Sequence, residues 1–254
     1  MVNAPPPLSH RVRGRWLGAG LIVAILLGLG GGRGVGAPAG APAVATPPLN
    51  MAALAGSVDP SIVDTIVFGQ PAGTQILGSG IILEGGGLIL TAAHVVRDEV
   101  FVGVRVGGVG RVIAARVVAT DAARDLALLR VDGSVRLRPA SLGPGPALIG
   151  EPVAVIGNAM GLGGVPRLTA GRLVALDQSI GYGVGSSTVH LAGTLEAAAP
   201  IAVGDSGGAL IDGRGRVIGV IAAAAGGSCS PTLCAMRVAY AIPIGRALTD
   251  LRLG

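Results

Sequence analysis

Three residues of the chain have the types and the order that nucleophilic catalysis requires. Ser206 stands in GDSGGAL (204–210), where glycines on both sides free the backbone and leave room for a substrate. A serine hydroxyl becomes a nucleophile only beside a base, and the base needs a partner that holds its tautomer. The motif alone is equally typical of a tight turn, so both interpretations of Ser206 stay open at this point.

A histidine would supply the base, and the chain has three. His94 follows an apolar run and two small residues in LILTAAHVV (88–96), which would leave its imidazole accessible, although a histidine satisfied at a strand end would give the same pattern. His10 lies in a basic N-terminal stretch, and His190 lies within STVHLAG (187–193), where alternation predicts an ordinary strand side chain. His94 is therefore the candidate base.

Two aspartates could hold this histidine. Asp125 comes directly before an apolar run in ATDAARDLALLRV (119–131), where its carboxylate would be half buried and would need a partner. Asp121 lies in the preceding turn, and an aspartate in a turn usually caps its own backbone. The sequence favours Asp125.

The segments LTAAHVV, DLALL and GDSGGAL, in that order, resemble the three signatures of the chymotrypsin-like, or trypsin-like, serine proteases. Two further stretches, VAVIGNAMGLGGVPRLTAGRLVAL (153–176) and VAYAIPIGRAL (238–248), resemble the Deg-type, or high-temperature-requirement, proteases of bacterial envelopes. The similarity runs from about Gly78 to Ile244. It implies a serine endopeptidase that acts on proteins or peptides through an acyl-enzyme, with no cofactor.

The resemblance also assigns roles around the triad of Ser206, His94 and Asp125. The backbone N–H groups of Gly204 and Ser206, with Asp205 between them, would form the oxyanion hole. A bound peptide would pair as an added strand. The residues expected to contact substrate are Ile221, Ala222 and Ala223 beside that strand, and Pro200 and Ile201 within the pocket stretch AAAPIAV (197–203).

The uncharged pocket stretch predicts cleavage after small or medium apolar residues. The chain departs in two ways from the families that it resembles. The aspartate that Deg-type proteases usually carry before the serine loop has no counterpart here, and the Ile-Val-Gly-Gly start that pairs with the residue in the position of Asp205 in trypsin-like enzymes is absent. Asp205 must therefore find another donor, or the site must be switched on. We also expect no PDZ domain after the barrels. The alternative function is a catalytically dormant, protease-like module that binds peptides.

The elements that position these residues are short apolar runs separated by Gly, Pro and Asp. Such runs are typical of strands, so the sequence predicts an all-β fold. The expected strands are 61–69, 80–91, 100–108, 111–120, 126–131, 152–157, 171–176, 187–193 and 216–224. Helical spacing of apolar residues predicts one helix over 244–254. The family resemblance implies two six-stranded antiparallel β-barrels, with His94 and Asp125 from the first and Ser206 from the second.

Composition excludes a nucleic-acid surface. All 19 basic residues are Arg, four of them lie before residue 46, and the other 15 nearly balance the 14 acids. Aromatic residues make up 2% of the chain, too few to stack bases. The histidines do not stand at metal-ligand spacing from the two cysteines, so no metal site is expected.

The first 45 residues have the pattern of an export signal. A basic stretch (10–16) precedes an apolar run (17–30) and a Pro/Ala/Gly stretch that contains Ala43-Val44-Ala45. We expect a cleaved signal peptide or an N-terminal membrane anchor with a flexible tether, followed by a protease domain over 46–254. Either places the domain outside the cytoplasm, where Cys229 and Cys234 would form a local disulfide.

Overall fold

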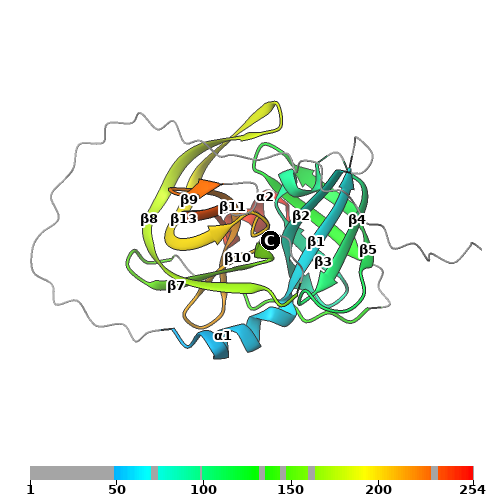
Figure 1. The fold of residues 1–254 in the computed structure, drawn as a ribbon, viewed down its shortest axis with the longest axis horizontal. Coiled ribbons are helices and arrows are strands. Elements are labelled where there is room, and N and C mark those ends of the chain that lie inside the picture. Colours follow the sequence, from blue (N-terminus) through cyan, green and yellow to red (C-terminus); the bar gives the residue numbers. More distant parts are fainter. Residues whose placement is uncertain are drawn as a thin grey trace, which may run out of the picture.

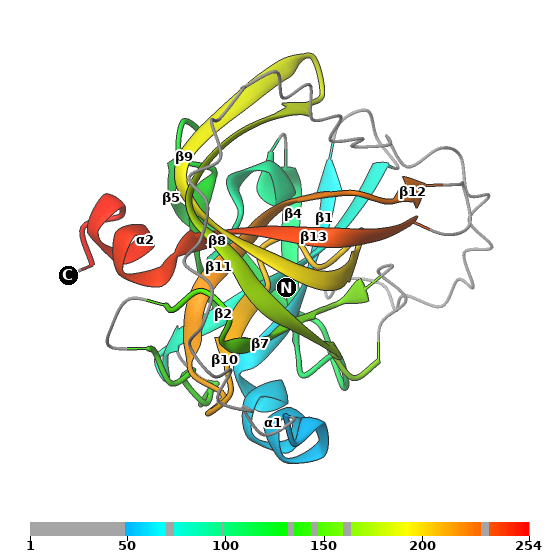
Figure 2. The same cartoon turned by 90° about the vertical axis from the view of Figure 1, so that its left-hand side faces the viewer.

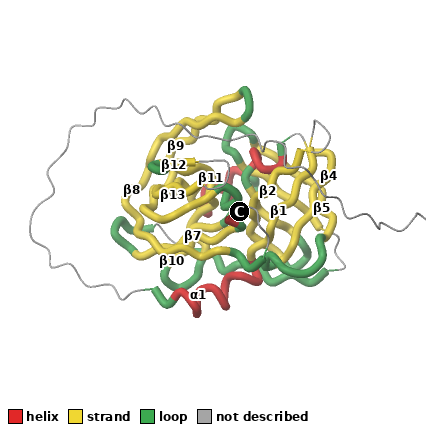
Figure 3. The backbone as a smooth tube through the Cα atoms, in the orientation of Figure 1, coloured by secondary structure: helices red, strands yellow, loops and turns green. Residues whose placement is uncertain are grey.

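The computed structural model describes residues 49–69, 74–97, 99–131, 135–143, 147–159, 164–229 and 234–253. The predicted export segment (1–45) and His10 lie outside these residues. Strands dominate the described chain (Figure 3). They form two β units that lie side by side, with the first six strands in one unit and the later strands in the other (Figure 1).

The first unit is a closed antiparallel barrel. Its strands are β1 (Ile62–Gly69), β2 (Thr74–Glu84), β3 (Leu88–Thr91), β4 (Glu99–Val106), β5 (Ile113–Asp121) and β6 (Leu126–Val131), hydrogen-bonded in the order β1-β2-β3-β6-β5-β4. Aliphatic side chains fill its interior, among them Val63, Ile82 and Ile89 with no exposed area. Short apolar runs predicted strands in these regions, but the expected strand 80–91 is divided by a turn between β2 and β3.

The second unit is a seven-stranded sheet that closes into a ring. Its strands are β7 (Pro152–Gly157), β8 (Arg167–Val184), β9 (Ser187–Ala202), β10 (Ala209–Asp212), β11 (Val217–Ala225), β12 (Ser228–Cys229) and β13 (Cys234–Pro243). The order is β11-β10-β7-β8-β9-β13-β12, and pairing of β11 with β13 completes the ring. The all-β prediction with two barrels is confirmed, and β12 adds a short seventh strand to the second.

Four short helical segments complete the described chain: α1 (Met51–Val58), the 3-10 turns η1 (Asp59–Ser61) and η2 (Ala93–Val96), and α2 (Ile244–Asp250). The sequence predicted α2, which ends four residues earlier than expected, but not α1. The Asn50 side chain caps α1 by accepting a hydrogen bond from Ala53 N at 3.0 Å. In the part of the chain that the structure describes, no helix combines the length and hydropathy needed to cross a bilayer.

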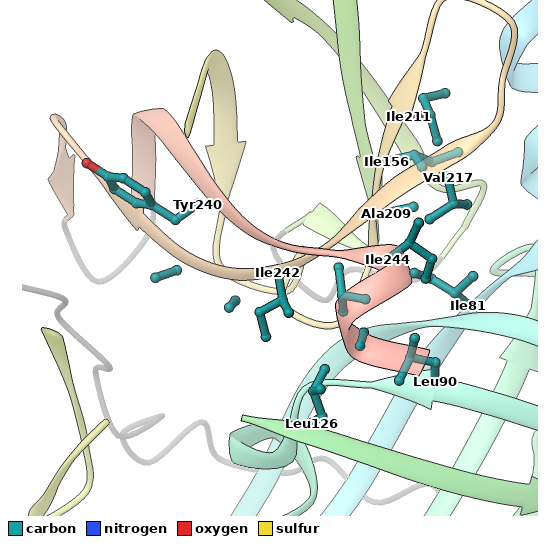
Figure 4. Close-up of a cluster of buried hydrophobic side chains, with 14 of the residues drawn as sticks. Ile81, Leu90, Leu126, Ile156, Ala209, Ile211, Val217, Tyr240, Ile242 and Ile244 are labelled. Carbon is teal, nitrogen blue, oxygen red and sulfur yellow. The ribbon is translucent and has the colours of Figure 1, made fainter. Parts of the chain in front are cut away.

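A hydrophobic cluster joins the two barrels (Figure 4). Ile81, Leu90 and Leu126 enter it from the first barrel, while Ile156 and Ala209 enter it from the second. All five are buried. Burial of apolar surface contributes about 25 cal/mol per Å², so this cluster fixes the two barrels, and the residues that they carry, against one another.

The β8–β9 hairpin is much longer than the sequence predicted. Expected strands of 171–176 and 187–193 are observed as strands of 18 and 16 residues. Figures 1 and 2 show the pair as a long curved hairpin that extends beyond the rest of its sheet. Irregular pairing between Leu173 and Ile180 marks the bend, because β-bulges bend and twist the strand that carries them.

Candidate active site

His94 and Asp125 meet on the first barrel. His94 lies in η2, directly after β3, and Asp125 lies directly before β6, which pairs with β3. The two side chains contact through His94 Nδ1 and Asp125 Oδ2 at 2.7 Å, and both are buried. Asp125 Oδ1 also accepts the backbone N–H of His94 at 2.8 Å. The carboxylate therefore fixes both the position of the histidine backbone and the orientation of its ring.

The backbone at Asp125 takes an uncommon conformation that serves this contact. Its φ of 54° lies in the left-handed region, which aspartate tolerates better than most residues. Its carbonyl oxygen accepts the N–H of Ala93 at 3.1 Å, so backbone and side chain both bind the histidine turn. Asp121 instead accepts hydrogen bonds from Arg124, at 3.1 Å to the backbone and 2.6 Å to the side chain. Asp125, as the sequence favoured, is the aspartate that contacts His94.

The sequence pattern did not predict one residue of this site, Tyr182. Tyr182 of β8 donates its hydroxyl to Asp125 Oδ2 at 2.5 Å and is 3% exposed. Its ring stands edge-on to the His94 ring, with centroids 6.2 Å apart and an interplanar angle of 79°. The tyrosine lies 57 residues after the aspartate, and no local pattern marks the contact, since it depends on the curvature of the β8–β9 hairpin.

The loop that carries Ser206 packs against the first barrel. Ser206 O accepts the N–H of Ser79 at 2.8 Å, and the Ser79 hydroxyl donates to Gly204 O at 2.7 Å. Gly207 has a φ of 80°, and a Cβ there would overlap Thr91 Oγ1 and Ser79 O. Glycine is thus required at position 207 by steric contacts as well as by the turn. It allows the serine loop to approach the end of β3, which leads to His94.

The two backbone N–H groups expected to form the oxyanion hole have no acceptor among the described residues. Among the described residues, neither Gly204 N nor Ser206 N donates a hydrogen bond. The N–H between them, that of Asp205, donates to Ala202 O at 3.2 Å. Gly204 adopts a φ of 98°, which a residue with a Cβ rarely takes. Among the described residues, the Asp205 N–H therefore has an acceptor, whereas the N–H groups of its two neighbours, Gly204 and Ser206, do not.

The Asp205 side chain is buried beneath this loop. Its Oδ2 accepts the N–H of Ala202 at 2.8 Å, whereas its Oδ1 has no partner among the described residues. Burial raises the pKa of Asp205 to about 7, and the hydrogen bond from Ala202 and the charge of Arg167 oppose that rise. Asp205 thus finds its donor in a backbone amide of the same loop, which binds one of the two carboxylate oxygens.

The Ser206 hydroxyl, partly exposed, makes no hydrogen bond to any described residue, His94 included. In free enzymes the bond between nucleophile and base is often long and tightens when substrate binds. His190 lies away from this site: it is exposed and pairs with Gly181 in the β8–β9 hairpin, as the strand pattern predicted. Within the described ranges, no group of three or more His, Cys, Asp or Glu side chains is arranged to hold a metal ion.

Ile221, Ala222 and Ala223, which are expected to lie beside the substrate, belong to β11, and Ile221 pairs with the serine loop. Ile221 donates its N–H to Gly208 O at 2.9 Å and accepts the N–H of Gly207 at 2.8 Å. Both of its backbone groups therefore support the serine loop. Pairing of β11 with β10 ends at Val220, and a bulge in the pairing with β13 follows Ile221. The edge of β11 beside the serine loop thus starts at Ala222.

The expected pocket residues have different environments. Ile201 is 4% exposed and packs in the core of the second barrel, so its side chain supports the stretch from inside. Pro200 is exposed, and its carbonyl oxygen accepts the Thr169 hydroxyl at 2.5 Å. Val203, directly before Gly204, is 49% exposed. Pro200 and Val203 thus expose apolar side chains, and Val203 directly precedes the serine loop.

The structure describes the backbone, but not the side chains, of the two cysteines predicted to form a disulfide. Backbone pairing sets Cys229 of β12 opposite Cys234 of β13, the first residue pair of that hairpin. The side chains of both cysteines lie outside the described residues. The disulfide stays a prediction.

Comparison with known proteins identifies the family. The family model described as a trypsin-like peptidase domain matches residues 78–220, which include His94, Asp125 and Ser206. This chain belongs to the trypsin-like peptidase family. The region matched begins on β2 and ends on β11, so the family match extends over both barrels.

Relatives of this peptidase confirm the resemblance to Deg-type proteases. The serine protease PepD of Mycobacterium tuberculosis is 32% identical over 219 residues, which are 81% of this chain and 46% of PepD. The periplasmic serine endoprotease DegP of Salmonella typhimurium is 32% identical over 154 residues, 60% of this chain and 31% of DegP. The peptidase therefore spans about half the length of PepD and a third of DegP.

A solved structure of the same type matches the fold. The structure of the HtrA-type protease AlgW with a tripeptide has a TM-score of 0.67 and 27% sequence identity, over 80% of this chain and 62% of that chain. The two barrels thus follow the fold of an HtrA-type protease.

Proposed function

We propose that this peptidase is an exported serine endopeptidase. The observation that carries the proposal is the buried contact of His94 Nδ1 with Asp125 Oδ2, set against a serine loop with two free backbone donors. In the proposed reaction Ser206 Oγ attacks the peptide carbonyl carbon and His94 Nε2 takes the hydroxyl proton. Asp125 stabilises the resulting imidazolium.

The serine loop stabilises the oxyanion, and His94 protonates the leaving group. The N–H groups of Gly204 and Ser206 bind the negative oxygen of the tetrahedral intermediate, and a single such donor contributes about 10²- to 10³-fold to turnover. His94 then gives its proton to the leaving amine. Water, activated in turn by His94, releases the acyl group from Ser206 and restores the enzyme.

We assign substrate binding to the edge of β11. A peptide pairs with the backbone from Ala222 to Ala223 as an added strand, beside the serine loop. The side chain before the cleaved bond meets Val203 and the exposed part of the uncharged stretch 197–203. Such surroundings favour small or medium apolar residues and give no counter-ion to Arg or Lys.

Export and domain limits complete the proposal. Residues 1–45 direct the chain out of the cytoplasm and 46–254 form the protease domain. The support is the basic and apolar pattern of the N-terminus, and the periplasmic location in the printed name of the DegP relative. Its partners are protein or peptide substrates.

A dormant peptide-binding module is the second candidate function. The specific observation in its favour is that the Ser206 hydroxyl makes no hydrogen bond to His94. Against it stand the free donors at Gly204 and Ser206, which a binding module has no need to keep.

Hydrolysis of a matched peptide series tests the enzyme. The full chain and its Ser206→Ala variant are incubated with peptides that differ only in the residue before the scissile bond: Ala, Val, Leu or Arg. We expect cleavage after the apolar residues by the wild type alone. Cleavage after Arg at an equal or higher rate would refute the assigned specificity, and cleavage by Ser206→Ala would refute the nucleophile.

A further inference from the structure

Asp125 receives a hydrogen bond that comes from the other barrel. Its Oδ1 accepts the His94 backbone N–H, and its Oδ2 accepts both His94 Nδ1–H and the Tyr182 hydroxyl. Among the described donors to this carboxylate, Tyr182 alone belongs to the second barrel. The tyrosine hydroxyl and the imidazole therefore share one carboxylate oxygen, at 2.5 and 2.7 Å.

The direction of this hydrogen bond is set by electrostatics. Burial raises the pKa of Tyr182 well above its usual range, and the charge and hydrogen bond of Asp125 raise it further. The hydroxyl therefore keeps its proton and donates it. A carboxylate that is 1% exposed is costly unless it is fully hydrogen-bonded, so the third donor stabilises the ionised form of Asp125.

The hairpin that carries Tyr182 also contacts the segment that follows His94. Arg97 Nη1, three residues after His94, donates to Val184 O at 2.8 Å, close to the hairpin turn. Ile180, Val184 and Leu191 are buried around the tyrosine in the cluster that joins the barrels. The tip of β8–β9 thus contacts both Asp125 and the segment that follows His94.

We propose that Tyr182 is a positioning residue of this peptidase. This inference rests on the proposed function: the hydroxyl fixes the rotation of the Asp125 carboxylate, so that Oδ2 points at His94 Nδ1 while the imidazole changes its charge. Because the donor sits on the second barrel, which also carries Ser206, the same hairpin couples the orientation of the base to the barrel of the nucleophile.

Removal of a single oxygen atom tests the role. Tyr182→Phe keeps the ring and loses the hydrogen bond, so we expect kcat to fall by about ten- to a hundredfold, with KM little changed. The acid limb of the kcat/KM profile should move to higher pH, because a carboxylate with one donor fewer attracts the imidazolium proton more strongly. The other tyrosine of the chain provides the control: Tyr240→Phe should alter neither quantity.

A second readout separates this inference from the proposed function. The His94 Nδ1 proton bound to Asp125 gives a downfield proton NMR signal, which should shift in Tyr182→Phe and stay in place in Tyr240→Phe. An active wild type whose kcat, pH profile and NMR signal all survive Tyr182→Phe would overturn the inference. A wild type that cleaves no peptide, yet shows the NMR shift, would refute the proposed function and leave the positioning role standing.

Discussion

Asp125 illustrates how one buried charge organises the site at the scale of single residues. It binds the His94 ring, the His94 backbone and the Tyr182 hydroxyl from a left-handed backbone conformation. The first contact could be predicted, because an aspartate directly before an apolar strand must be half buried and partnered. The contact with Tyr182 could not, since nothing in the residues around position 182 reports how far the hairpin bends.

Substitution of this carboxylate should abolish most of the turnover without loss of the fold. Asp125→Asn removes the charge that stabilises the imidazolium and allows the wrong tautomer, so peptide turnover should fall by about 10⁴-fold. Asp121→Asn, four residues earlier in the turn, is the matched control and should stay near the wild type. Steady-state hydrolysis and circular dichroism check this. A loss of only a few-fold in Asp125→Asn would mean that another group holds the histidine.

At the scale of elements, the glycines of the serine loop allow it to pack against the first barrel at Ser79 and Thr91. The strand pattern predicted most of the strands correctly, and the GDSGGAL motif indicated a loop with unusual backbone. The lengths of β8 and β9 were missed, because the hairpin tip is rich in Gly and Ser and lacks the apolar alternation of a strand. The hydrogen bonds of Ile221 to the serine loop could not be predicted either, because they join two separate segments of the chain.

Alanine substitution at two glycines with nearly equal φ separates the steric effect of a Cβ from its effect on backbone conformation. Gly207 and Gly110 have φ of 80° and 78°, but a Cβ at Gly207 would overlap Thr91 and Ser79, whereas nothing lies within 4 Å at Gly110. Gly207→Ala should lower the free energy of unfolding by roughly 3 kcal/mol or more, against about 1 kcal/mol for Gly110→Ala. Chemical denaturation measures both, and equal losses would show that the serine loop is not sterically constrained here.

A buried charge also lies between the barrels, at the scale of the whole molecule. Asp64 of β1 alternates with Val63, which faces the barrel interior, so it points outward on the side of Ile62 and the cluster between the barrels. It is 1% exposed, neither carboxylate oxygen is hydrogen-bonded to a described residue, and Arg105 Nη1 lies 3.8 Å away. The apolar pattern predicted the two barrels, but not that a carboxylate would be buried where they meet.

This aspartate should make the protein more stable in mild acid. Burial raises the pKa of Asp64 from 3.8 to about 6, with Arg105 opposing the rise. The folded state therefore binds the proton more tightly, and its contribution is lost as pH rises through that window. Between pH 4 and 6 the free energy of unfolding should fall by on the order of 1–3 kcal/mol.

Asp64→Asn should flatten that slope, while the buried Asp205, with its pKa of about 7, continues to destabilise the fold up to neutral pH. Asp177→Asn, the same change at an exposed position, should leave the slope intact. Urea denaturation across this pH range gives the comparison. An unchanged slope in Asp64→Asn would show that the carboxylate is already satisfied in the fold.

The central claim is that Ser206 is a nucleophile activated by His94, and covalent labelling tests it most directly. The purified full chain and its Ser206→Ala variant are treated with a fluorophosphonate and analysed by mass spectrometry. The proposed mechanism predicts one adduct per chain on Ser206 of the wild type and none on the variant. A folded wild type that remains unlabelled, or that is labelled at another residue, would contradict the mechanism.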